Sequence, residues 1–169
     1  MEAPLPRVRA RNASINAIRY AETLVRELGE AGYVIVSGMA RCIDAAAHCG
    51  AMATGTVGVI AGGIDIIYPP ENLTLFQQIV EEGLLLAKMR PGTAPTPRQL
   101  PTRNPIIASL ALGVVVIEAA PKSGLLITAR EAGERGSKVM AITRSPLDPR
   151  SNGCNQLNRD GAALVQKSG

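Results

Sequence analysis

The amino-acid sequence predicts an α/β fold with a doubly wound, mostly parallel sheet. Short apolar segments alternate with helical patterns along the chain, the order that produces β-α-β units with right-handed crossovers. Aromatic residues make up only 2% of the 169 residues, so the core must be aliphatic, as in parallel sheets covered on both faces. A hydrophobic content of 46% in a chain of this length predicts a single domain spanning 1–169.

The first half of the chain is predicted to form three helices and three strands. Apolar residues recur at helical spacing from Ile15 to Leu28, and Gly29 and Gly32 end that pattern. Leu5 to Arg9 is too short and too basic for a central buried strand, so we expect the first strand of the sheet to be missing or incomplete. In order, we expect a helix at 15–28, a strand at 33–36, a helix at 39–52, a strand at 57–60, a helix at 71–82 and a strand at 84–86.

The second half follows a proline-rich connection from Arg90 to Thr102. Its four prolines exclude regular structure there. A valine-rich run from Gly113 to Ile117 is the clearest strand of the chain. We expect a helix at 103–110, strands at 113–117 and 139–142 with a helix at 126–135 between them, then a helix at 154–159 and a strand at 163–165.

Charge and cysteine content restrict the class of partner. A net charge of +4 and a pI near 9.3 favour an anionic partner, and arginines cluster at Arg7, Arg9 and Arg11. The three cysteines form no CxxC pair and are odd in number, which argues against a disulfide framework and against a zinc site. No signal pattern or long apolar run is present, so we expect a cytoplasmic protein without a metal or cofactor.

Two strand-to-helix turns are candidate phosphate sites. The strand at 33–36 continues into Ser37, Gly38 and Arg41, and the strand at 113–117 is followed by Ser123 and a helix that contains Thr128. Such turns direct backbone N–H groups and a helix N-terminus at an anion. The alternative is an ordinary turn with a serine cap, and the local pattern alone favours this alternative.

The sequence contains no recognisable catalytic machinery. Neither a GxxxxGK[ST] loop nor a GxGxxG fingerprint is present, and the only histidine, His48, is expected to be structural because no nucleophile or carboxylate stands at a recognisable spacing from it. Arg103 and Asn104 open a helix, where a guanidinium suits phosphate, and Asp44 is placed to brace a loop. We therefore expect a binding protein, not an enzyme.

Seven ordered motifs resemble the DNA-processing protein A (DprA, or Smf) family over residues 8–165. They are Arg11-Asn12-Ala13-Ser14, Ser37 to His48, Tyr68 to Asn72, Arg103-Asn104, Glu118 to Ala120 with Ser123-Gly124, Leu126 to Ala129, and Asn155 with Asp160 to Ala162. The resemblance implies an extended Rossmann-like fold without the flanking helical and winged-helix domains of many relatives. It also implies binding of single-stranded DNA, a homodimer, and loading of a RecA-type recombinase during natural transformation.

The resemblance also assigns site residues. It implies phosphate contacts from three successive turns and a groove completed by the fourth, with Asp44 as structural support. The residues so assigned are Arg11, Ser14, Ser37, Gly38, Arg41, Arg103, Asn104, Ser123 and Thr128.

The sequence departs from the family pattern at several turn positions. Arg9, Cys42 and the pair Thr143-Arg144 stand where the family has glycines or Pro-Gly, and Leu100 replaces an aromatic residue. Glycine permits positive φ and close backbone approach, so we expect strain of roughly 1 kcal/mol or more at each replaced glycine. Two alternatives therefore stay open: a truncated, diverged remnant of such a protein, and a nucleotide-processing enzyme of the lysine-decarboxylase-like type.

Overall fold

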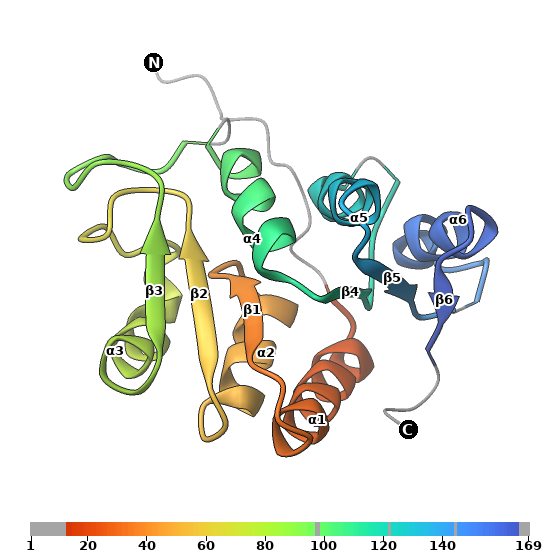
Figure 1. Ribbon diagram of the computed structural model, residues 1–169, viewed down its shortest axis with the longest axis horizontal. Coiled ribbons are helices and arrows are strands. Elements are labelled where there is room, and N and C mark those ends of the chain that lie inside the picture. The colour runs from red at the N-terminus through yellow and green to blue at the C-terminus, as the bar shows by residue number, and fades with distance from the viewer. Residues whose placement is uncertain (1–12, 97–98, 122, 144, 166–169) are drawn as a thin grey trace.

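A computed structural model of the protein describes residues 13–96, 99–121, 123–143 and 145–165. Helices and strands alternate through these residues, as the sequence predicts (Figure 1). The first half comprises α1 (Ile15–Glu30), β1 (Ile35–Gly38), α2 (Ile43–Ala51), β2 (Thr56–Ile60), α3 (Leu73–Glu82) and β3 (Leu84–Ala87). The second half comprises α4 (Asn104–Leu110), β4 (Gly113–Val116), α5 (Gly124–Glu134), β5 (Lys138–Ala141), α6 (Asn152–Arg159) and β6 (Ala163–Leu164).

All pairings between these strands are parallel, so the predicted fold class is confirmed. The hydrogen bonds divide the strands into two sheets of order β1-β2-β3 and β4-β5-β6. Figure 1 shows the strands across the molecule as β3, β2, β1 and then β4, β5, β6. The predicted absence of a first strand falls on residues 1–12, outside the described residues, and it stays a prediction.

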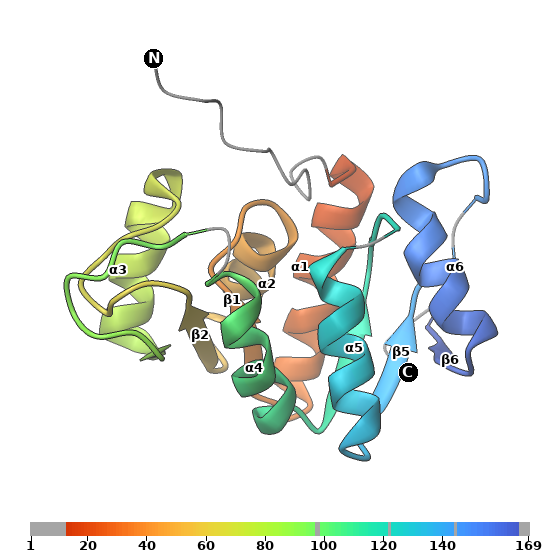
Figure 2. The ribbon, with the colours of Figure 1, turned by 90° about the horizontal axis from the view of Figure 1, so that it is seen from above.

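Helices cover both faces of the strands, as expected for a doubly wound fold. On one face, Ala17 and Ala21 of α1 form a buried cluster with Ala46 of α2 and Ile117, which follows β4. Another cluster on the α2 and α3 side joins Met39, Ile60, Leu75, Phe76 and Ile79. On the opposite face, Ala129 of α5 and Cys154 of α6 pack against Val116 and Ala141. Figure 2, seen from above, shows α4 across the strands from α2.

Most element boundaries shift by one or two residues from the sequence prediction, and two of the differences lie at the site and have local reasons. The helix expected from residue 39 begins only at Ile43, because residues 39–42 form the turn after β1. The strand expected at 33–36 lies at Ile35–Gly38, and Tyr33 and Val34 precede it with about half of each side chain exposed. Within the described residues, no helix is long and apolar enough to cross a membrane.

Candidate nucleic-acid interface

The candidate site residues gather at the carboxyl ends of β1 and β4. The strand order runs outward from β1 to β3 and outward again from β4 to β6, so it reverses between β1 and β4. In doubly wound folds, ligands bind beyond the carboxyl ends of the strands at this reversal point. The turns after β1 and β4 and the starts of α1 and α4 all lie here.

A buried guanidinium packs against Gly38 at the end of β1. A Cβ atom at Gly38 would lie 2.3 Å from Nη2 of Arg103, so glycine is required for the arginine to occupy this position. Nη1 of Arg103 donates to the carbonyl oxygen of Val59 at 3.2 Å, and Nη2 lies 3.7 Å from a carboxylate oxygen of Asp44. Arg103 therefore ties the start of α4 to β1, to β2 and to α2.

Burial shifts the ionisation of Arg103 without removing its charge. Desolvation lowers the pKa of Arg103 from its ordinary value, and the Asp44 carboxylate partly offsets that effect. Only 11% of the Arg103 side chain is exposed, and its Nε atom is buried without a hydrogen-bond partner among the described residues. Its guanidinium therefore contacts mainly β1, β2 and α2.

The turn between β1 and α2 is braced from several directions. Asp44 accepts a hydrogen bond from the backbone N–H of Ala40 at 3.2 Å, and Asn72 donates to the carbonyl oxygens of Met39 and Ala40 at 3.1 and 3.2 Å. The side chain of Arg41 is one third exposed and pairs with Glu71. The turn is therefore fixed while Arg41 remains partly accessible.

Cys42 holds a backbone conformation that is unusual for a residue with a side chain. Its φ of 65° and ψ of −103° lie near the first central position of a type II′ turn, which glycine dominates. The resemblance placed a glycine at this position, and the structure shows the conformational reason for that glycine.

His48 is a structural residue, fully buried below the turn after β1. Its Nε2 lies 3.0 Å from the carbonyl oxygen of Gly38, and its Nδ1 lies 2.7 Å from the hydroxyl of Thr56. With Nε2 protonated, the ring donates to the carbonyl oxygen of Gly38, and the single hydrogen of the Thr56 hydroxyl lies between His48 Nδ1 and the carbonyl oxygen of Ile35, which is 3.1 Å away. Burial, the largest cause, lowers the pKa of His48 and favours the neutral form.

The second half of the site joins the starts of α1 and α5 to the end of β4. The buried carboxylate of Glu118 accepts hydrogen bonds from the hydroxyl and backbone N–H of Ser14, at 2.6 and 3.0 Å. Asn104 and Thr128 both donate to the carbonyl oxygen of Gly124, at 3.4 Å. Ser123 caps α5 by accepting from the backbone N–H of Leu125.

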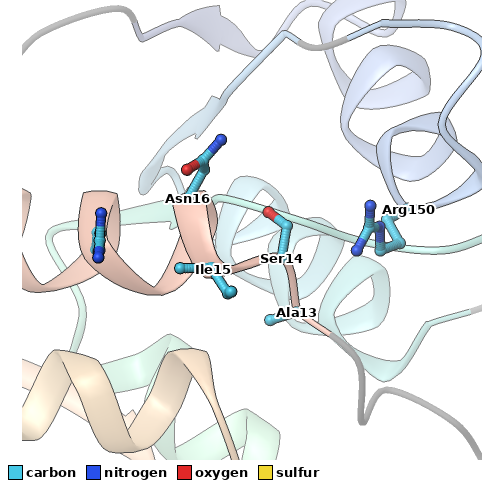
Figure 3. A pocket seen from close by; sticks show the side chains of 6 residues that line it. Ala13, Ser14, Ile15, Asn16 and Arg150 are labelled. Atoms are coloured by element: carbon cyan, nitrogen blue, oxygen red, sulfur yellow. The ribbon is translucent and has the colours of Figure 1, made fainter.

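A shallow depression, wide open to the surface, lies at the N-terminus of α1. It is lined by Ala13, Ser14, Ile15, Asn16, Arg19 and Arg150 (Figure 3). The positive end of the α1 dipole and the exposed Arg19 favour an anion here. Arg150 adds a second guanidinium, which also forms a two-point ion pair with Asp148 through Nε and Nη2, each 2.9 Å from a carboxylate oxygen. The carbonyl oxygen of Arg150 accepts a hydrogen bond from the N–H of Ala119, which positions Arg150 beside the end of β4.

The sequence missed both arginines of this depression. Arg19 lies in a segment whose pattern predicts a helix but no binding site. Arg150 follows a proline in a segment without a recognised motif. The one sequence signal was charge, because each is a cation near a predicted helix terminus. Their proximity to Ser14 depends on the packing of the two halves, which no local pattern encodes.

The predicted site residues separate into buried and accessible groups. Gly38, Asn104 and Thr128 are buried, and Arg103 is nearly so. Ser14, Ser37, Arg41 and Ser123 are partly exposed. Gly38 and Arg103 touch, and Asn104 and Thr128 share Gly124, whereas Arg41 lies apart beside Glu71. Arg11 lies outside the described residues, and its assignment stays a prediction.

Comparison with known proteins decides the family. The family model described as DNA recombination-mediator protein A matches residues 7–169. The chain belongs to this family. The DNA processing protein DprA of Streptococcus pneumoniae is 42% identical to it over 160 residues, covering 94% of this chain and 56% of that protein. Protein Smf of a Synechocystis species is 41% identical over 149 residues, covering 87% of this chain and 37% of that protein.

Solved structures of the DprA family share the architecture. The crystal structure of DprA from Streptococcus pneumoniae superposes with a TM-score of 0.87 at 39% identity, covering 94% of this chain and 56% of that one. DprA from Helicobacter pylori, whose structure is described as revealing a single-stranded DNA binding mode, gives a TM-score of 0.87 at 28% identity and covers 94% of this chain and 73% of that one. The chain spans about half or less of the length of the curated DprA and Smf proteins named above.

Proposed function

We propose that this chain binds single-stranded DNA through the phosphate backbone at the carboxyl ends of β1 and β4. The observation that carries the proposal is the open depression at the N-terminus of α1, where the helix dipole, Arg19 and Arg150 lie beside the point at which the strand order reverses. Membership of the DprA family, which includes a structure described by its single-stranded DNA binding mode, supports the same class of ligand.

In this proposal the accessible polar residues contact phosphate and the buried ones hold them in place. The contacts come from Ser37, Arg41 and Ser123, with Arg19 and Arg150 added, and Arg11 is assigned to the same group on sequence alone. Ser14, whose hydroxyl and backbone N–H both donate to Glu118, belongs to the frame. Gly38, Arg103, Asn104 and Thr128, together with Asp44, form the supporting frame. Charge on partly or fully exposed side chains suits a ligand that is bound through its phosphates without base specificity.

The wider role proposed for the chain is that of a cytoplasmic DNA-processing protein. It would protect incoming single strands, form a homodimer, and load a RecA-type recombinase in natural transformation. We propose a binding role and not catalysis: the ring of His48, whose pKa burial lowers, is fully buried and contacts only Gly38 and Thr56 in the hydrogen bonds that the described residues show for it. Within the described residues, no cluster of His, Cys, Asp or Glu could hold a metal ion.

The test is fluorescence anisotropy of a labelled oligo-dT at a series of salt concentrations. The double variant Arg19→Ala, Arg150→Ala removes both cations of the depression. A charge-matched control, Arg26→Ala with Arg130→Ala, removes two exposed arginines elsewhere on the helices. Each lost phosphate contact should reduce the slope of log K against log salt by about 0.7, so the Arg19→Ala, Arg150→Ala variant should lose about 1.4 and the control much less.

Two results would argue against the proposal. Equal slopes for the Arg19→Ala, Arg150→Ala variant and the control would place the DNA elsewhere on the surface. A cooperatively folded wild-type chain that shows no binding at low salt would favour the remnant interpretation instead.

A further inference from the structure

The loops that follow β2 and β3 lie side by side at the carboxyl edge of the sheet (Figure 1). The N–H of Gly63 donates to the carbonyl oxygen of Thr93 at 2.9 Å. The N–H of Gly92 donates to both carboxylate oxygens of Asp65, at 2.7 and 2.9 Å. A Cβ atom at Gly63 would lie 2.6 Å from the carbonyl oxygen of Arg90, so the two backbones approach as closely as glycine allows. The arrangement of the two loops is therefore fixed before any ligand binds.

This pair of loops carries two exposed cations, Lys88 and Arg90. Lys88 directly follows the last residue of β3, so it stands just beyond the carboxyl end of that strand. Neither cation forms an ion pair within the part of the chain that the structure describes. Asp65 is the one acidic residue in 61–70 and 88–96, and its carboxylate holds the turn after β3. Two positive charges are thus presented at this edge on a fixed backbone.

The loop after β2 joins these cations to the turn after β1. Near its start, Gly63 packs against the backbone of Arg90. At its other end, Glu71 pairs with Arg41, and Asn72 donates to two carbonyl oxygens of the turn that carries this arginine, at 3.1 and 3.2 Å. The strands β1 and β3 flank β2, and neighbouring strands stand about 4.8 Å apart, so the carboxyl ends of β1 and β3 lie about 9.6 Å apart. A strand of DNA bound at Arg41 can therefore continue toward Arg90 along one edge of the sheet.

The same loop carries an exposed aromatic side chain between its two ends. Tyr68 is 37% exposed, and Ile64 on the same loop is 40% exposed. The other aromatic residues of the chain lie elsewhere: Phe76 is buried, Tyr33 precedes β1 at its amino end, and Tyr20 packs against the cluster under α1. Unpaired bases stack on aromatic side chains with little regard to sequence, because every base has a π-face. Tyr68 therefore gives this edge a surface for a base between two groups of cations.

We propose that Lys88, Arg90 and Tyr68 form a second contact region for the bound single strand, which we call the β3 rim. Lys88 and Arg90 bind phosphates, and Tyr68 stacks on an unpaired base between these cations and Arg41. This inference rests on the proposed function and extends it from the ends of β1 and β4 to the ends of β2 and β3. The ligand is an unpaired strand, because the bases of a duplex stay in their own stack.

The first test measures anisotropy of labelled oligo-dT in a salt series with the full chain and its Lys88→Ala, Arg90→Ala variant. The control Arg135→Ala, Lys138→Ala removes one exposed arginine and one exposed lysine at the amino end of β5, on the opposite edge of the sheet. The rim variant should lose about 1.4 from the slope of log K against log salt, because each phosphate contact to a single strand contributes about 0.7, and the control should keep the wild-type slope. Equal slopes for the two variants would overturn the β3 rim.

The second test separates base stacking from charge. Tyr68→Leu should weaken binding of oligo-dT on the order of 10-fold and leave the salt slope unchanged, whereas Tyr68→Phe should keep the wild-type affinity. Neither variant should alter binding of an abasic strand with the same number of phosphates. An equal loss for oligo-dT and the abasic strand would show that Tyr68 acts only through the fold, and would overturn its role in stacking.

Failure of the β3 rim and failure of the proposed function give different results. Salt-dependent binding that is weakened by Arg19→Ala with Arg150→Ala, but by neither the Lys88→Ala, Arg90→Ala variant nor Tyr68→Leu, would overturn the rim and leave the site at β1 and β4 intact. A folded wild-type chain that binds neither oligo-dT nor the abasic strand would overturn both.

Discussion

Replacing Cys42 by glycine should stabilise the protein. Cys42 holds φ 65° and ψ −103° at the start of α2, a region that L residues with a Cβ enter only with strain. Backbone strain of this kind costs about 1–3 kcal/mol. Glycine would relieve it, because no Cβ meets the neighbouring peptide groups in that conformation.

The net gain is smaller than the strain relieved. Glycine increases the conformational entropy of the unfolded chain, which costs about 0.4–1 kcal/mol. The difference leaves a stabilisation of about 1 kcal/mol, equivalent to a rise of about 2–4 °C in melting temperature for a chain of this size. Cys42→Ala retains a Cβ while removing the thiol, so it should show no comparable gain.

Urea denaturation and thermal melts of the two variants isolate the backbone effect. The free energy of unfolding of Cys42→Gly minus that of Cys42→Ala cancels any contact made by the sulfur. As a further contrast, Cys49→Gly places the same residue within α2 and should destabilise the protein by about 1 kcal/mol. If Cys42→Gly proves no more stable than Cys42→Ala, the backbone of Cys42 carries no appreciable strain.

Three further predictions concern the buried frame. Gly38→Ala should destabilise the protein by about 2 kcal/mol in urea denaturation, since its Cβ would displace the guanidinium of Arg103, whereas Gly124→Ala, with its nearest neighbour atom at 3.8 Å, should be nearly neutral. Asp44→Asn should lower the free energy of unfolding by about 3 kcal/mol, because it leaves the buried charge of Arg103 without its partner. Glu71→Gln, at the more exposed pair with Arg41, should lower it by less than about 1 kcal/mol. Equal losses for the two variants would show that burial does not govern the strength of these pairs. The pKa of His48 is lower in the folded chain than in the unfolded chain, so the unfolded chain takes up its proton at a higher pH. The free energy of unfolding should therefore fall as the pH drops below about 6.5, by up to about 1.4 kcal/mol per pH unit. Melts of His48→Gln from pH 7 to 5 should decline less steeply, and an identical decline would contradict this origin.

The fold class could be predicted because its signals are local. Valine-rich runs such as 113–117 and the helical spacing from Ile15 report strands and helices directly, and their alternation determines a parallel arrangement. The start of α2 was misplaced by four residues, since an Ala-rich segment has helix propensity whether or not a turn precedes it. Helix propensity does not report the positive φ that Cys42 adopts just before the helix.

The residue types of the candidate site could be singled out from the sequence, but their burial could not. Motifs placed Arg103, Asn104 and Thr128 at helix starts, where phosphate contacts are common, yet all three face inward. Burial of a polar residue depends on which elements pack over it, and Arg103 is buried because the glycine at position 38 leaves room for it. The sequence did not single out Arg19 and Arg150 as a pair, because they are far apart in the chain and only the fold places Arg150 beside the start of α1.

Buried frame residues and accessible contact residues should respond differently when DNA affinity and stability are both measured. A substitution in the frame, such as Asp44→Asn, should lower DNA affinity and the free energy of unfolding together, because the β1 turn loses its support. A substitution of an exposed cation, such as Arg150→Ala, should lower affinity and the salt dependence while leaving the melting temperature within about 2 °C of the wild type. Plotting affinity loss against stability loss for both groups tests the assignment, and a frame variant that loses stability but keeps full affinity would remove that residue from the interface.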